Sequence, residues 1–321
     1  MKPNGKIIDV GVPFLLQDTP NPVCRLPNKN FPVPAMNITV DLHEERRCIV
    51  NIIRIIMNLM SMTLILSILP GLLAGWLVNY LADVLPATRR FSQPVCPQCG
   101  TPFRWPDYLL LRSCQNGHSR TVRVWVVQII LLAASIITWI EPPSKLGYFL
   151  GMILAVYFGV VFVIDLEHRL ILHPTSIFGA ILGLIVGMIA HGIQPTLLGG
   201  LGGLLIMLAF YGLGVLFTRI RTKRMLALGQ EADDEEALGS GDVILVTILG
   251  CIVGWPLIWL CLLYGILLGG LVSLFIVLWL IISGRYKISA LMTFIPYGPY
   301  FITTAVLVVY FPKFLALIVP G

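Results

Sequence analysis

Charged residues are scarce in this chain. Of its 321 residues only 12% are Asp, Glu, Lys or Arg, whereas 57% are hydrophobic. Soluble domains are about 25% charged and about 45–50% apolar. One soluble core could not bury this much apolar surface, so the composition excludes a disordered chain, a collagen-like chain and an ordinary soluble enzyme. It predicts an all-α polytopic membrane protein.

Three further features are missing. Residues 1–48 lack the apolar segment that follows the basic start of a secretory signal peptide, and their many prolines favour an irregular N-terminal extension. The seven cysteines do not form the even, regularly spaced set of a disulfide scaffold. The net charge of +6 is spread between apolar runs and not over one solvated face. We therefore expect the lipid bilayer as a partner and no nucleic acid.

Long apolar runs fill the rest of the chain. A helix that spans a bilayer needs about 20 mainly apolar residues. Eight segments meet this description: 63–82, 122–140, 146–164, 175–192, 196–217, 243–262, 263–283 and 290–310. We divide the chain into the extension 1–48, the first transmembrane helix 63–82, a cysteine-rich loop 83–121 and a membrane core 122–311. The boundary between the sixth and seventh segments, near Leu262, is only weakly marked.

The distribution of Lys and Arg predicts the orientation. Most basic residues outside the N-terminal extension lie in loop 83–121 and in the connections after the third, fifth and seventh segments, whereas the opposite side has Lys145 and Lys313. Loops rich in Lys and Arg stay in the cytoplasm. We therefore expect these connections to be cytoplasmic. The basic N-terminal extension would then start outside, against the rule.

Two carboxylates lie at the predicted membrane boundary. Asp165 ends the third segment and Asp242 begins the sixth. The third segment runs inward and the sixth outward, so both aspartates are expected at the same depth on the cytoplasmic side. Charges at such positions are costly and are functional candidates. Taken singly, Asp242 could also be a helix cap, and Asp165 an interfacial charge like its neighbour Glu167 or like Asp83.

The chemistry of such a pair is that of an aspartic protease. Two adjacent carboxylates cannot both ionise easily, so they share a proton. One can take a proton from water while the other polarises a peptide carbonyl. Gly239 and Gly241, with Ser240 between them, would let a substrate backbone approach Asp242 closely.

These residues resemble a known family. Asp165 followed by Gly239-Ser240-Gly241-Asp242 is similar to the GxGD membrane aspartyl proteases, specifically the type IV prepilin peptidases. Gly71 to Pro86 resembles the first helix of that family, and Phe294 to Ala305 resembles its Pro-Phe-Gly-Pro segment. A cysteine-rich loop after the first span is also typical of the bacterial members. The resemblance covers about residues 63 to 311, although Ala74 and Trp76 depart from the pattern of the first helix.

The resemblance implies a function and a location. It implies an endopeptidase in the bacterial inner membrane, multi-pass, with its active site facing the cytoplasm, which removes the leader from type IV prepilins or pseudopilins. Asp165 and Asp242 would be catalytic. The resemblance also associates the loop region with N-methylation of the product, for which S-adenosylmethionine would be the donor.

The loop itself has the spacing of a metal site. Cys96 and Cys99 stand two residues apart, so both thiolates can bind one ion from a tight turn, and Cys114 and His118 could complete a tetrahedral zinc site. We expect a structural Zn²⁺. Unligated loop cysteines are the alternative. The family usually has a second Cys pair where this chain has Cys114 and His118.

Other classes of protein remain open from the sequence. A transporter or channel could use Asp165 and Asp242 as ion or proton sites, but it would need a continuous polar path, and the middles of the spans carry almost no charge. A GxGD peptidase for other signal-like peptides and a catalytically inactive scaffold are the closer rivals.

Overall fold

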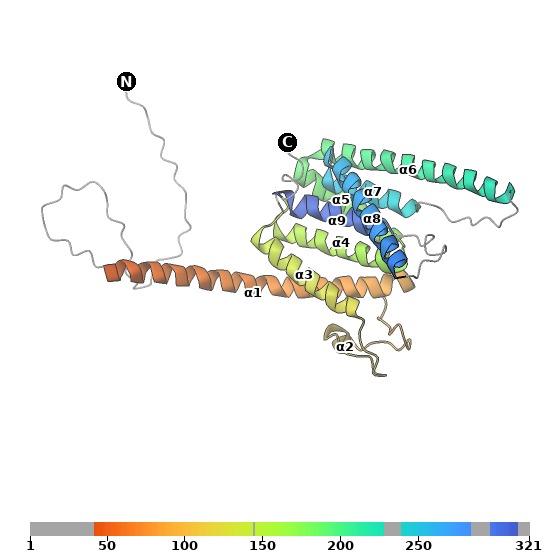
Figure 1. Cartoon of the computed structure of the whole chain (residues 1–321). Helices are drawn as coiled ribbons and strands as arrows, with labels where there is room; N and C mark the ends of the chain where they lie inside the picture. Colours follow the sequence, from red (N-terminus) through yellow and green to blue (C-terminus); the bar gives the residue numbers. More distant parts are fainter. Residues whose placement is uncertain (1–41, 144, 228–238, 284–295, 314–321) are drawn as a thin grey trace, which may run out of the picture. The chain divides into compact units, whose positions relative to one another are not determined.

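The computed structural model describes residues 42–143, 145–227, 239–283 and 296–313. These residues are almost entirely helical and contain no named strand (Figure 1). The helices are α1 (Leu42–Thr88), α2 (Trp105–Leu109), α3 (Val122–Ile140), α4 (Gly147–His168), α5 (His173–His191), α6 (Ile193–Ala227), α7 (Ser240–Val253), α8 (Leu257–Ile282) and α9 (Gly298–Tyr310). The prediction of an all-α polytopic membrane protein is confirmed.

Two compact units divide the chain, residues 1–62 and residues 63–321. In the first unit the structure describes the start of α1, which begins at Leu42, so residues 42–48 are helical and not irregular as expected. The rest of the predicted extension, 1–41, lies outside the described residues. In the second unit α1 continues to Thr88, six residues past the expected end of the first span at 82. The cysteine-rich loop therefore begins only after Thr88.

Six of the described helices are long and apolar enough to cross a membrane, namely the part of α1 from Ile65 together with α3, α4, α5, α6 and α8. Helices α7 and α9 are apolar but shorter. The expected eighth segment, 290–310, is described only from 296 onward, where α9 begins at Gly298.

The expected boundary between the sixth and seventh segments was wrong. Helix α7 ends at Val253 and α8 begins at Leu257, well before Leu262. Gly254 terminates α7 with a φ of +78°, which glycine adopts at little cost, and Pro256 has no backbone N–H to continue the helix. Because the region is hydrophobic throughout, its hydropathy did not indicate the break between α7 and α8, which Gly254 and Pro256 cause.

Helix α4 is the centre of the second unit. It contributes buried residues to two hydrophobic clusters, one shared with α1 and α3 and one shared with α5, α6, α7, α8 and α9. Of its apolar window 56% is buried inside the protein, compared with 11% for α8, which presents most of its surface outward. A charged residue at the end of α4 is therefore held by neighbours on several sides.

Helices α6 and α7 pack backbone to backbone. A Cβ atom on Gly199 would lie 2.3 Å from the carbonyl oxygen of Gly250, and the reverse contact is equally short. Small residues allow such close approach between membrane helices. The glycines of α6 thus have a packing role, and they fix α7, whose first turn contains Asp242.

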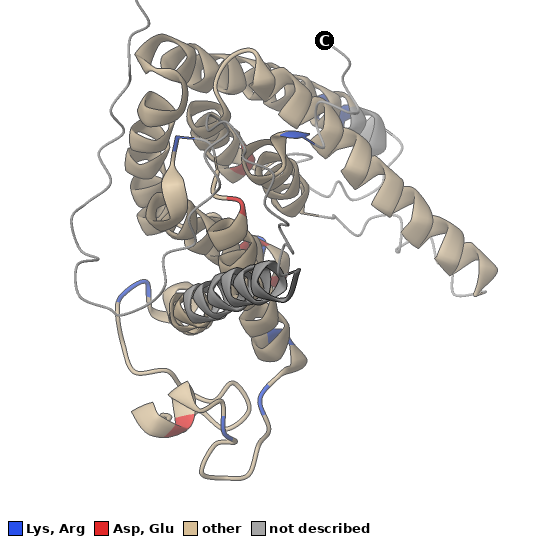
Figure 2. Cartoon of the chain, turned by 90° about the vertical axis from the view of Figure 1, so that its left-hand side faces the viewer, with Lys and Arg blue, Asp and Glu red and all other residues tan. Residues whose placement is uncertain are grey.

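Charged residues are rare along the described helices, most of which are tan in Figure 2. In the spans they lie near the ends, as Asp83 does in α1, Arg123 in α3 and Asp165 in α4. The charged segment 219–238 is described only in part, because residues 228–238 lie outside the described residues.

Candidate active site and metal site

Asp165 lies in the last turn of α4. Arg169 ends the helix in a left-handed conformation, and its N–H donates to the Asp165 carbonyl oxygen at 2.9 Å. The Asp165 side chain is buried, with 4% of the residue exposed, and its Oδ2 atom has no hydrogen-bond partner among the described residues. A buried carboxylate oxygen without a partner is costly, which is typical of a functional position.

Asp242 lies in the first turn of α7. Gly239 caps this helix, its carbonyl oxygen accepts the Asp242 N–H at 3.1 Å, and the Asp242 side chain is partly buried. Gly239 and Ser240 are exposed, so the backbone beside Asp242 is open to an approaching chain. No side-chain hydrogen bond caps the helix, so the capping role considered for Asp242 is not what the structure shows.

The segment that follows α4 packs against the start of α7. Ile171, just after α4, packs against Gly241, where an added Cβ would lie 3.1 Å from the Ile171 Cβ. Ile171 stands six residues after Asp165, and Gly241 directly precedes Asp242, so this contact places both aspartates at the same end of the second unit. The tertiary structure thus brings together two aspartates that α5 and α6 separate in the sequence.

Helix α9 completes this site. At its first residue, Gly298, a Cβ atom would lie 2.1 Å from Asp165 Oδ2 and 3.2 Å from Leu245 of α7. Only a residue without a side chain fits between these two helices. The sequence pointed to the segment around Gly298 through a resemblance, but its contact with Asp165 could not be read from the pattern.

An apolar cavity of about 230 Å³ adjoins the same end of α4. Leu166 follows Asp165 directly, and Pro299 follows Gly298, and both line the cavity. Its remaining walls come from α4, α8, the residues just before α9 and the beginning of α9: Phe162, Leu268, Val272, Pro296, Tyr300 and Thr303. The site around Asp165 therefore lies next to a cavity that can accommodate apolar side chains.

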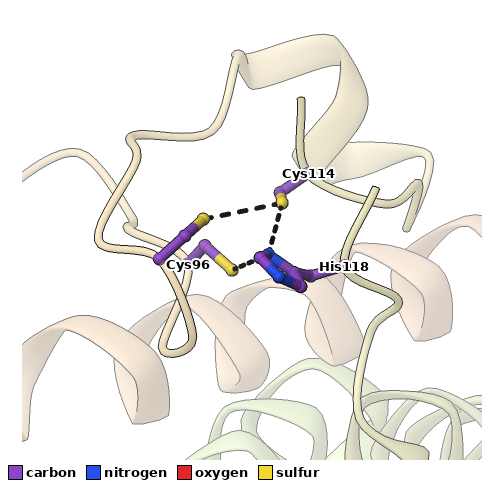
Figure 3. Close-up of side chains that lie close together, drawn as sticks. Cys96, Cys114 and His118 are labelled. Carbon is purple, nitrogen blue, oxygen red and sulfur yellow. Dashed lines mark hydrogen bonds between the residues drawn. The ribbon is translucent and has the colours of Figure 1, made fainter. Parts of the chain in front are cut away.

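The four predicted metal ligands converge. The sulfur and nitrogen atoms of Cys96, Cys99, Cys114 and His118 that can bind a metal all lie within 4.8 Å of one another. Figure 3 shows Cys96, Cys114 and His118 of this group. The Cys99 and Cys114 sulfurs are 3.7 Å apart, and the Cys114 sulfur is 3.4 Å from His118 Nδ1. Thiolates about 2.3 Å from a tetrahedral zinc ion stand roughly 3.8 Å from one another. The cluster could hold a metal ion, and its donors suit zinc.

Two tight turns present these ligands. Each turn contains a glycine with positive φ after its cysteine. Gly100, at +70°, directly follows Cys99, and Gly117, at +81°, stands three residues after Cys114. The Gly100 N–H donates to the Cys96 carbonyl oxygen, and the Gly117 N–H to that of Cys114. The hydroxyl of Thr101, 3.0 Å from the Cys99 sulfur, lowers the pKa of Cys99 to about 6. This lowering of the pKa favours the thiolate form of Cys99, the form that binds metals.

Sequence reasoning missed a second polar cluster at this end of the second unit. Asp83 and Glu167 were expected to be separate interfacial charges. Both instead pair with Arg123 at the start of α3, Glu167 at 2.7 Å, and Asp83 also pairs with Arg120. The signal in the sequence was the position of three charges at the ends of apolar spans, where single charges are costly.

Comparisons with known proteins identify one family. Residues 152–274 match the model of the Type IV leader peptidase family. The match includes Asp165 and Asp242 but neither the cysteine-rich loop nor α9. No curated protein and no solved structure matches the chain. The resemblance inferred from the sequence is confirmed by this match, which indicates a protease.

Proposed function

We propose that this protein is a membrane-embedded aspartic endopeptidase. The proposal starts from a membrane chain whose residues 152–274 match the Type IV leader peptidase family. The proposed enzyme removes the leader from type IV prepilins or pseudopilins at the cytoplasmic boundary of the bacterial inner membrane. The observation that carries the proposal is the buried carboxylate of Asp165, whose Oδ2 has no partner among the described residues and lies against Gly298 of α9, while the segment after α4 packs against Gly241, next to Asp242.

In the proposed mechanism the two aspartates share one proton. One carboxylate takes a proton from a water molecule, whose oxygen attacks the carbonyl carbon of the peptide bond, while the protonated partner donates a hydrogen bond to the carbonyl oxygen. The resulting tetrahedral intermediate breaks its C–N bond as a proton passes to the leaving nitrogen. Because coupled carboxylates titrate as a pair, the roles of base and acid belong to the dyad and not to one residue.

The surroundings of the dyad support an extended substrate that enters from one side. The exposed backbone at Gly239 and Ser240 allows a peptide to lie next to Asp242. The cavity beside Leu166 and Pro299 suits the apolar helix that follows the leader. A substrate with a polar leader and an apolar helix would place the junction between them near the carboxylates.

The cysteine-rich loop has a structural role in this proposal. Zn²⁺ held by Cys96, Cys99, Cys114 and His118 would cross-link its two turns, because the loop has only a small core of its own. N-methylation of the product, with S-adenosylmethionine as donor, is a further activity that the resemblance implies, and it stays a prediction.

A transporter is the second candidate and is less well supported. In the described spans no Asp, Glu, Lys or Arg lies in the middle of a helix, whereas an ion pathway needs polar groups across the membrane. The deciding experiment incubates the purified protein in detergent with a prepilin and follows loss of the leader by mass spectrometry. Cleavage by the parent protein but not by Asp165→Asn supports the peptidase; no cleavage by the parent would contradict it.

A further inference from the structure

A cluster of charges at one end of the second unit joins the cysteine-rich loop to the helix that carries Asp165. Its central residue is Asp83, near the end of α1. The Asp83 carboxylate accepts a hydrogen bond from the Tyr108 hydroxyl at 2.6 Å, lies 3.6 Å from Arg120 and is paired with Arg123. One carboxylate thus receives donors from α2, from the end of the loop and from α3.

On the loop side the contacts reach the predicted metal site. Arg120 follows the ligand His118 by two residues, and its guanidinium lies over the rings of Phe103 and Tyr108 at 4.3 and 4.1 Å. Phe103 and Tyr108 form the small hydrophobic core of the loop together with two of the metal-binding cysteines. Contacts that fix Arg120 and Tyr108 therefore also stabilise the two turns that carry the cysteines and His118.

On the membrane side the contacts reach the last turn of α4. Arg123 pairs with Asp83 through one nitrogen and with Glu167 through the other, the latter at 2.7 Å. Glu167 follows Asp165 by two residues in the same turn. A displacement of Arg123 therefore acts directly on the turn that carries Asp165.

The pairs of Asp83 differ from ordinary surface salt bridges, whereas the Glu167 partner of Arg123 is 38% exposed. The side chains of Asp83 and Arg123 are each 19% exposed and that of Arg120 is 7% exposed. Exposed pairs contribute little, but removing one partner of a shielded pair leaves the other charge without compensation. The exposed pair of Arg112 and Asp107, 4.0 Å apart on the same loop, provides the contrast within this chain.

We propose that Asp83 is a positioning residue that couples the cysteine-rich loop to the catalytic end of α4, through Tyr108 and Arg120 on one side and through Arg123 and Glu167 on the other. Its effect on cleavage rests on the proposed peptidase function, whereas the coupling itself does not. The loop then helps to fix the position of α4, which carries Asp165, and is not structurally independent of the membrane helices.

Hydrogen–deuterium exchange tests the coupling without any assay of activity. In the full-length protein in detergent, Asp83→Asn should raise exchange about tenfold both in loop 89–121 and in the last turn of α4, since it removes charge-assisted hydrogen bonds on both sides. Glu167→Gln should raise it in the last turn of α4 with less effect on the loop. Asp107→Asn is the matched control and should leave α4 unchanged. Faster exchange in the loop alone for Asp83→Asn would overturn the proposal.

Cleavage of a prepilin tests the catalytic consequence. Asp83→Asn should lower kcat by about ten- to a hundredfold with KM nearly unchanged, because misplacement of a reacting group acts on the chemical step. Asp83→Glu, which keeps the charge, should recover part of this loss, and the double variant with Glu167→Gln should lose less than the two single effects combined. Full kcat in Asp83→Asn would contradict positioning. If the parent protein cleaves nothing, the peptidase function fails, while the exchange result still decides the coupling.

Discussion

The metal-ligand cluster and the aspartate pair lie at the same end of the second unit but are assembled in different ways. Cys96, Cys99, Cys114 and His118 come from one loop, and two tight turns with glycine at positive φ aim them at a common point. Asp165 and Asp242 come from two helices that α5 and α6 separate in the sequence, and a third helix, α9, closes the site at Gly298.

This difference predicts how substitutions should affect each of the two sites. A site made within one loop depends on local turns and on its ion, so its loss should disturb the loop more than the membrane core. A site made between helices depends on packing at a distance, so a change of a few atoms at a helix contact can misplace the reacting groups. The predictions below test this contrast, beginning with the largest effect.

Replacement of either aspartate should have the largest effect. Asp165→Asn and Asp242→Asn should each lower cleavage by about 10²–10⁴-fold or more, because an amide cannot exchange a proton in the working range. Asp→Glu at either position should also be poor, since the added methylene moves the carboxylate. Initial rates of leader removal measure the effect, with folding checked by size-exclusion chromatography. Near-normal rates in either folded Asn variant would exclude the dyad.

Gly298→Ala should have the next largest effect, although it adds only one methyl group. The new Cβ would overlap Asp165 Oδ2, so the carboxylate must move, and a shift of about 1 Å can cost about 10²-fold in rate. Gly270→Ala is the matched control, because a Cβ at Gly270 meets nothing within 4 Å. Equal activity of the two variants would show that α9 does not position Asp165.

Loss of the metal ligands should affect metal content more than cleavage. The purified protein should carry about one zinc ion, as expected of a closed four-ligand site, and the double variant Cys96→Ser/Cys99→Ser should carry none. Its cleavage rate should fall less than in the aspartate variants. Elemental analysis by mass spectrometry measures the zinc. Retention of the ion by the double variant would rule out this site.

Substitutions that report orientation should have the smallest effect on activity. Arg104→Cys and Lys223→Cys should react with an impermeant thiol reagent from the cytoplasmic side, and Lys145→Cys from the other. All three side chains are exposed, so activity should stay within about twofold of the parent. Arg104 and Lys223 on opposite faces would separate the loop from the dyad and contradict both the orientation and the proposed function.

Much of the helical architecture could be predicted because hydropathy is a local property. The span predicted at 122–140 has the same bounds as α3, and the span predicted at 146–164 appears as α4 with its ends shifted by a few residues. The break at Gly254 was missed because the residues on both sides are uniformly apolar, and a hydropathy window is insensitive to a turn inside such a run. The length of α1 was missed for a related reason, since its first residues are too polar to be expected in a span.

The sequence by itself determined that the chain is a helical membrane protein, that four residues of one loop could bind a metal, and that Asp165 and Asp242 are candidates for the active site. Composition, short spacing and the position of a charge at a helix end are enough for these conclusions. Only the tertiary structure decided that Gly298 lies against Asp165, and that Asp83 links the loop to α4 through Arg123 and Glu167. Such contacts join residues far apart in the chain, and they depend on which helix faces pack together, which no local pattern specifies.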